Sequence, residues 1–152
     1  SYTGKHTEEY QEDRFMPVVS ELIRIEDDGT ISFGNYELAT KSKLQDFEYK
    51  GDLYIVKTFH EITKLERNGM FVYESVPGTA VNHFAVDDSE VTFAVEGNQD
   101  AQITVQLEDD REYEVFIDGI AVGGMTTNVS GKLVLSVELN EGVRTEIRIA
   151  GR

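Results

Sequence analysis

Residues 101–108 read Ala-Gln-Ile-Thr-Val-Gln-Leu-Glu, so that apolar and polar side chains alternate strictly along the segment. Because successive side chains of a β-strand point to opposite faces, this alternation predicts a strand with one buried and one solvated face. Similar rows recur through the C-terminal half, and antiparallel sheets packed face to face produce such rows. We therefore predict a β-sandwich, of jelly-roll or immunoglobulin-like type, over residues 87–152. The expected inward rows are Val91/Phe93/Val95, Tyr113/Val115/Ile117, Ile120/Val122, Leu133/Leu135/Val137/Leu139 and Val143/Thr145/Ile147/Ile149.

Residues 18–86 are expected to form a second antiparallel region of β-hairpins or a meander. An Asp28-Gly29 turn separates two short alternating runs, Ile23 to Ile25 and Ile31 to Phe33. Apolar residues spaced by three over residues 59–65 would also fit a helix, but their β-branched neighbours favour strands. The whole chain is therefore predicted to be all-β.

The Asn68-Gly69 pair is the strongest hairpin signal in this region, because a type I′ turn needs positive φ at both central residues. In a regular register Phe71 and Tyr73 share one face of the hairpin. The expected pairs are Arg67 with Met70, Glu66 with Phe71, Leu65 with Val72 and Lys64 with Tyr73.

Composition excludes several classes of function. The chain of 152 residues has a formal net charge of −15, which disfavours nucleic acid as a partner because such binding depends on clustered Lys and Arg. It has no Cys, and hence no disulfide and no thiolate ligand. No apolar run is long enough for membrane insertion. No signal peptide is visible, so the default location is the cytoplasm. Residues 1–17 are expected to be either an added extension or a natural N-terminal arm.

The segment Leu53–Val56 is apolar on both faces, which indicates burial between layers or beneath a contact between subunits. Aromatic side chains of the following hairpin fit the same kind of contact. We therefore expect a homo-oligomer, with a glycan as the alternative partner of this face. The residues expected at the interface or ligand face are Tyr54, Val56, Phe71 and Tyr73, joined by Tyr10 and Phe15 of the N-terminal arm.

No recognisable catalytic motif occurs, and we expect neither enzymatic activity nor a cofactor. His6, His60 and His83 lack metal-ligand spacing, although the last two could meet near strand ends. Acidic clusters at turns offer weak calcium candidates, and solvated turn caps are the alternative interpretation. These candidates are Asp87, Asp88, Asp109 and Asp110.

Two stretches carry a wider resemblance, L-I-R-I-E-D-D-G-T-I-S-F-G-N-Y (residues 22–36) and V-Y-E-S-V-P-G-T-A-V (residues 72–81). They are similar to segments of short proteins of clostridial-type bacteria that often carry the name "endosialidase". Tyr113–Leu139 resembles a strand–turn–strand pattern of small β-sandwich modules in bacterial polysaccharide-active enzymes, where such modules are accessory rather than catalytic.

Sialic-acid hydrolysis itself is not expected from these residues. The families that perform it use six-bladed propellers with Ser-x-Asp-x-Gly-x-Thr-Trp turns, whereas this chain has no Trp and is too short for six blades. The sequence therefore predicts a non-catalytic structural or assembly protein that forms homo-oligomers through exposed strands. The alternative is a carbohydrate-binding accessory module.

Overall fold

The structure, a computed structural model, describes residues 18–152. Over this range the chain forms β-strands and no helix, so it holds no helix capable of spanning a membrane. Every pairing between neighbouring strands is antiparallel, which confirms the predicted class. The strands are β1 (Ile23–Ile25), β2 (Ile31–Phe33), β3 (Ser42–Tyr49), β4 (Asp52–Phe59), β5 (Ile62–Arg67), β6 (Met70–Val76), β7 (Ala80–Val86), β8 (Glu90–Glu96), β9 (Ala101–Gln106), β10 (Glu112–Ile117), β11 (Ile120–Thr126), β12 (Lys132–Val137) and β13 (Thr145–Gly151).

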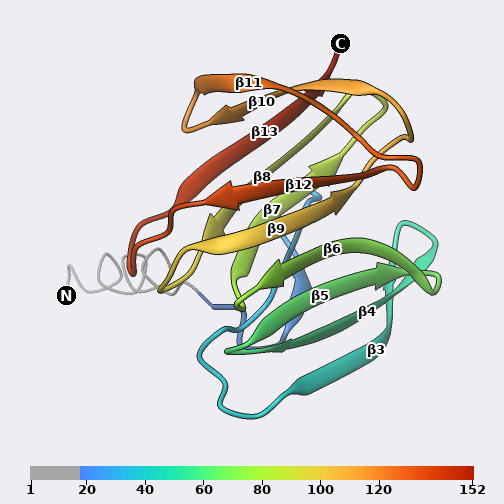
Figure 1. The fold of residues 1–152 in the computed structure, drawn as a ribbon. Helices are drawn as coiled ribbons and strands as arrows, with labels where there is room; N and C mark the ends of the chain where they lie inside the picture. The colour runs from blue at the N-terminus through green and yellow to red at the C-terminus, as the bar shows by residue number, and fades with distance from the viewer. Residues whose placement is uncertain (1–17) are drawn as a thin grey trace.

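The strands build two sheets that face each other as a sandwich (Figure 1). The seven-stranded sheet has the order β1-β2-β7-β8-β13-β10-β11, and the six-stranded sheet has the order β12-β9-β6-β5-β4-β3. Strands β3 to β6 follow one another as the expected N-terminal meander. β13, the last strand, lies between β8 and β10 rather than at an edge.

Both halves of the chain contribute to both sheets. The division expected between residues 86 and 87 falls in the turn that joins β7 to β8, and these two strands pair with each other. In the other sheet β6 pairs with β9. A single cluster of buried apolar side chains accordingly runs from Ile23 to Ile149.

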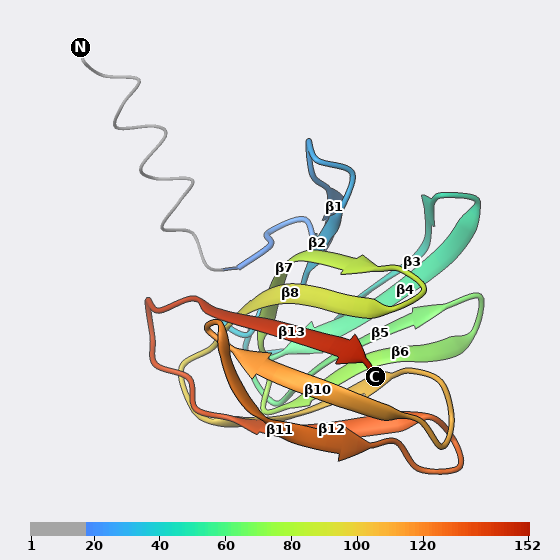
Figure 2. The ribbon, with the colours of Figure 1, turned by 90° about the horizontal axis from the view of Figure 1, so that it is seen from above.

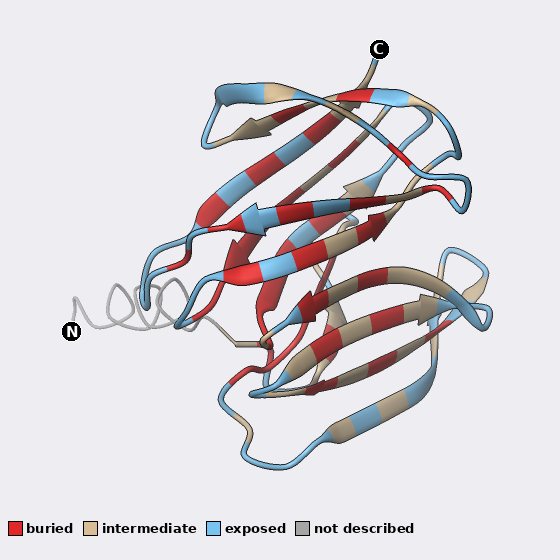
Figure 3. Ribbon diagram, in the orientation of Figure 1, coloured by how far each residue is buried: buried red, intermediate tan, exposed pale blue. Residues whose placement is uncertain are grey.

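Alternating burial along the strands shows which side chains fill this core (Figure 3). The row Leu133/Leu135/Val137/Leu139 is buried as predicted, with each side chain 2% exposed. Three other residues expected to point inward lie at the surface instead, namely Ile120, Val122 and Val143. Ile120 and Val122 lie on β11, an edge strand, and Val143 lies before β13 begins.

The hairpin of β5 and β6 begins in the predicted register and then departs from it. Arg67 pairs with Met70, but a register shift follows, and Leu65 pairs with Tyr73 instead of Val72. A β-bulge of this kind adds one residue to a strand and exchanges the faces of all side chains beyond it. Tyr73 therefore points into the core and is 0% exposed.

Buried hydroxyl groups connect the turn before β7 with the six-stranded sheet. Tyr73 Oη and Thr79 Oγ1 are 2.9 Å apart, and Ser75 Oγ lies 2.7 Å from the same Thr79 oxygen. Thr63 Oγ1 donates a hydrogen bond to the Thr79 carbonyl, at 2.7 Å. Gly34 packs against that carbonyl so closely that an added Cβ would lie 2.4 Å from the oxygen. The core is thus fixed at this point by polar contacts as well as by apolar packing.

Candidate functional site

Three of the residues expected at a subunit interface belong to the core of a single copy. Tyr54 is 7% exposed, and Val56 and Tyr73 are each 0% exposed. On β4, Tyr54 and Val56 occupy the inward face. The sequence could not indicate this, because a strand that is apolar on both faces gives no signal of which face turns inward. The prediction of an exposed interface face is therefore wrong for Val56 and Tyr73, whereas Tyr54 lines a cleft at one end of the sandwich.

The outward face of the six-stranded sheet is mixed in character. Leu53 is 47% exposed, but its neighbours on this face include an ion pair between Lys64 and Glu66, at 3.4 Å. Phe71 is half-buried, and the ammonium of Lys132 lies 4.8 Å from its ring centroid. Charged side chains thus interrupt the apolar surface on which the predicted interface depended.

The remaining predicted site residues are placed as follows. Tyr10 and Phe15 lie outside the described residues. Among residues 18–152, no group of three or more His, Asp or Glu side chains is arranged to hold a metal ion. Asp87 instead accepts hydrogen bonds from the backbone N–H groups of Ser89 and Glu90, which caps the turn before β8 and lowers the pKa of its carboxyl. The other calcium candidates, Asp88, Asp109 and Asp110, are exposed.

Edge strands on one side of the sandwich carry features that prevent pairing with another chain. β1 has only three residues, and Arg24 within it forms ion pairs with Glu21 and Glu26 at 3.3 and 3.0 Å. β3 is interrupted by a register shift between Leu44 and Phe47. It also carries the charged side chains Lys43, Asp46 and Glu48. Short length, charge and bulges are the means by which proteins block their sheet edges.

Strands β11 and β12 form the edges on the opposite side of the sandwich (Figure 2). They lack charge almost entirely. Lys132 is the only charged residue in the stretch 119–137, although 28% of the chain is charged. Exposed apolar side chains concentrate on this side, and an apolar, uncharged edge is a template for strand addition. They are Ile120 (69% exposed), Val122 (49%), Val129 (80%) and Val134 (46%).

Of these two edges, β12 is the one suited to receive another strand. β11 is bulged, because its register with β10 shifts at Val115 and leaves Val122 without a partner. β12 pairs with β9 without any shift along its whole length. A regular strand presents its free backbone groups in a straight row, whereas a bulge turns them aside.

Backbone hydrogen bonds show which groups of β12 are free. Gly131 accepts a bond from Leu107 on the β9 side, at 2.7 Å, and the direction of backbone groups alternates along an antiparallel strand. The groups of Lys132, Val134 and Ser136 therefore point to the open edge. Asn128 already occupies both backbone groups of Lys132. The Lys132 N–H donates to Asn128 Oδ1 at 3.0 Å, and the Lys132 carbonyl accepts from the Asn128 N–H at 3.3 Å. Within the part of the chain that the structure describes, Val134 and Ser136 remain as the available donors and acceptors.

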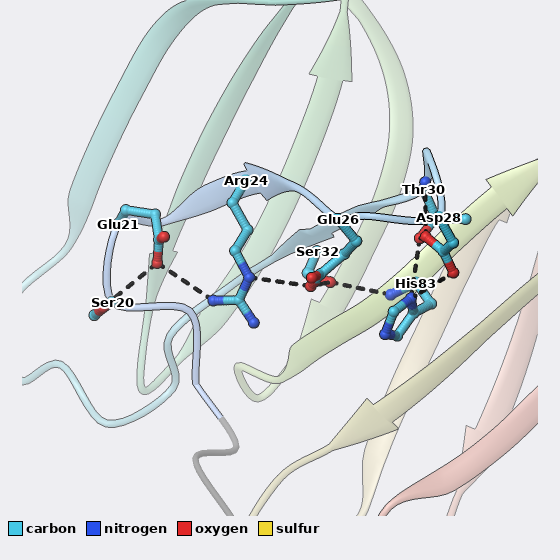
Figure 4. Close-up of polar contacts among 8 residues, drawn as sticks. All are labelled: Ser20, Glu21, Arg24, Glu26, Asp28, Thr30, Ser32 and His83. Atoms are coloured by element: carbon cyan, nitrogen blue, oxygen red, sulfur yellow. Dashed lines mark hydrogen bonds and ion pairs between the residues drawn. The ribbon is translucent and has the colours of Figure 1, made fainter. Parts of the chain in front are cut away.

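A second polar cluster runs along β1 and β2 and reaches β7 (Figure 4). His83 has positive φ (54°) at a bulge of β7, which places its imidazole beside Asp28, with Nδ1 3.0 Å from Oδ2. Thr30 Oγ1 lies 3.1 Å from the same imidazole nitrogen, and its hydroxyl donates to Asp28. The hydroxyl of Ser32 donates to Glu26. Because both hydroxyls donate to carboxylates, neither is activated by His83, and the cluster ties the β1–β2 hairpin to β7.

Thr30 is the main cause of a lowered pKa at Asp28. Its hydroxyl and backbone N–H donate to Asp28 Oδ1 at 2.6 and 3.0 Å, and His83 contributes less. Replacing Thr30 by valine should raise the Asp28 pKa towards its ordinary value, as followed by NMR titration of the carboxyl carbon. Because the Asp28 pKa is lowered in the folded state, the ionised carboxylate of Asp28 stabilises the fold at pH values above its ordinary pKa. This stabilisation is lost as the pH falls through the lowered pKa. His83→Gln should raise the Asp28 pKa less than Thr30→Val, and the reverse order would contradict this assignment.

His60 and His83 do not form the pair considered from the sequence. His60 Nε2 lies 4.0 Å from Glu61 Oε2, and the imidazole meets the Phe59 ring edge to face. His83 instead contacts Asp28 and Thr30. Sequence reasoning missed the contact between His83 and Asp28, because these residues are 55 positions apart and meet only through the pairing of β2 with β7.

No family model, curated protein or solved structure matches the chain. The resemblances noted in the sequence stay predictions.

Proposed function

We propose that the protein is a non-catalytic structural subunit that pairs with a second copy along β12. The observation that carries this proposal is the asymmetry of the sheet edges. β1 and β3 are short, charged or bulged, while β12 offers a regular and nearly uncharged edge. Pairing would extend the six-stranded sheet across a two-fold axis, as in other isologous dimers.

One antiparallel register uses all the free groups of this edge. With Leu135 opposite Leu135 of the second copy, Val134 faces Ser136 and exchanges both backbone hydrogen bonds with it, twice by symmetry. The same register places Lys132 opposite Glu138. Glu138 is exposed and shares the outward face with Val134. Two cross-strand ion pairs flank the paired segment once the Lys132 ammonium swings from the Phe71 ring, now 4.8 Å away, toward the open edge.

The distribution of charge favours contact between two copies at β11 and β12 over contact at any other surface. Each copy has a formal net charge of −15, so two copies repel each other wherever acidic surfaces meet. The stretch 119–137 holds no acidic residue, and contact there brings neutral surfaces together. The exposed valines of β11 and of the loop before β12 add apolar area beside the pairing strands.

The test is a charge exchange at the two ends of β12. In the dimer, Glu138→Lys would place two lysine side chains opposite each other at both ends of the paired segment. The repulsion should weaken dimerisation by about tenfold or more. The double variant Lys132→Glu/Glu138→Lys restores opposite charges and should restore the affinity. Sedimentation equilibrium between about 10 μM and about 1 mM covers the range expected for a small interface.

Glu48→Lys on β3 is the matched control, since it changes the charge equally on the blocked edge. It should leave dimerisation unchanged. A wild-type protein that stays monomeric throughout this range, or a double variant that dimerises no better than Glu138→Lys, would refute pairing along β12.

A further inference from the structure

A cleft opens at the end of the sandwich where several hairpin turns meet. It has a volume of about 270 Å³ and lies between the β1–β2 turn, the β3–β4 turn and the ends of β5, β6 and β7. Pockets for drug-sized ligands measure about 300–1,000 Å³. The cleft therefore has room for one small molecule.

Charges around the cleft balance one another. Two carboxylates, Asp28 and Asp52, and two cations, Lys50 and Arg67, contribute to its lining. This balance is local, since acidic residues outnumber basic ones 29 to 14 in the chain as a whole. A neutral ligand with both hydrogen-bond donors and acceptors fits such a lining better than an ion of either sign.

Apolar and aromatic groups form the rest of the lining. Val72 and Tyr49 are half-buried and supply accessible apolar surface, while Ile31 and Phe84, 1% and 4% exposed, form the floor of the cleft. Tyr49 and Tyr54 meet edge to face, with ring centroids 5.7 Å apart and an interplanar angle of 63°. Burial raises the pKa of the Tyr54 hydroxyl above its ordinary value, and the neighbouring Arg67 acts in the opposite direction.

Hydrogen bonds hold two of the lining side chains, Tyr49 and Asp52, in place without a ligand. The Tyr49 hydroxyl donates to the Gly29 carbonyl at 2.5 Å, and this contact joins the turns of the two sheets. Asn68 donates to Asp52 at 2.9 Å and accepts from the backbone N–H of Leu53 at 3.0 Å. Asp52 is thereby oriented, and a ligand would bind without first ordering the site.

From this arrangement we infer that the cleft binds one neutral, polyhydroxylated ring, such as a monosaccharide unit. The carboxylates accept hydrogen bonds from ring hydroxyls, Arg67 and Lys50 donate to them, and the apolar surface receives the C–H face of the ring. The cleft lies among residues of β1–β7, away from β12, so binding does not depend on the proposed pairing of copies.

Titration by two-dimensional NMR tests this inference. The probes are glucose, galactose, mannose and N-acetylglucosamine at millimolar concentration, compared with glucuronic acid and N-acetylneuraminic acid. At least one neutral sugar should shift the signals of Tyr49, Tyr54 and Asp52. Asp52→Asn and Arg67→Gln should each weaken that binding by about tenfold.

Asp88→Asn is the control, since it removes the same charge from an exposed turn that does not line the cleft. It should leave the affinity unchanged, and unshifted signals elsewhere in the spectra should show that each variant is folded. The inference is overturned if no neutral sugar shifts the cleft residues, if the shifts map elsewhere, or if an anionic sugar binds more tightly than its neutral counterpart. Sedimentation of the same samples reports the pairing of copies separately.

Discussion

Replacing Tyr73 by alanine should lower the free energy of unfolding by about 3–5 kcal/mol. Typical domains have about 5–15 kcal/mol in total, so the expected loss is a large part of it. The ring is fully buried and meets Phe33 and Phe93 edge to face, at centroid distances of 5.3 and 5.8 Å. The substitution leaves a cavity at the centre of this cluster and removes a partner of Thr79. Urea unfolding followed by circular dichroism measures the loss.

Phe71→Ala is the informative comparison for Tyr73→Ala. A regular hairpin would place both aromatic rings on the same face, whereas the bulge leaves Phe71 half-buried on the outward face. Phe71→Ala should cost only about 1 kcal/mol. Tyr73→Phe keeps the ring and should also cost about 1 kcal/mol, since Ser75 and Thr79 still bond to each other. Equal losses for Phe71→Ala and Tyr73→Ala would mean that the bulge is absent.

Replacing Gly34 by alanine is the second change with a large expected effect, about 3 kcal/mol or more. Gly34 has φ of +102°, and a Cβ atom would meet the Thr79 carbonyl oxygen at 2.4 Å. A backbone oxygen cannot turn aside as a flexible side chain can. Accommodating the methyl group would therefore separate the β2 end from the buried hydroxyl groups around Thr79.

Gly142→Ala separates the two causes of this loss. Gly142 also has positive φ (+81°), but no atom of the described residues lies within 4 Å of the position that a Cβ atom would take. Its substitution should cost about 1–2 kcal/mol from backbone strain alone. Urea midpoints of the two variants measure the difference, and a Gly34→Ala protein no less stable than Gly142→Ala would contradict the close approach to Thr79.

Local patterns sufficed to predict most of the strands and the class of the fold, although they indicated no strand at β7. The alternation of residues 101–108 corresponds to β9, and the row from Leu133 to Leu139 fills the core as expected. The Asp28-Gly29 and Asn68-Gly69 turns occur at the predicted positions, and Gly29, Asn68 and Gly69 adopt positive φ there. Each of these features depends on residues that are neighbours in the chain, which is the information a sequence presents directly.

The candidate site could not be obtained in the same way. The bulge before Tyr73 changes which face is buried, and β4 has two apolar faces that alternation alone cannot distinguish. The cleft combines Asp28, Tyr54 and Arg67 through the packing of two sheets. Likewise, the sequence itself shows that residues 119–137 are nearly uncharged, but only the strand order shows that they form two edges with no neighbouring strand among residues 18–152.

The position of β13 has a consequence for folding during synthesis. Residues 145–151 fill the gap between β8 and β10, which were translated earlier. Until this segment leaves the ribosome, the facing borders of β8 and β10 have no hydrogen-bonding partner, and β10 and β11 cannot join the rest of their sheet. A nascent chain that has not yet released this segment therefore exposes open strands, and chaperone binding at that stage would most effectively prevent aggregation.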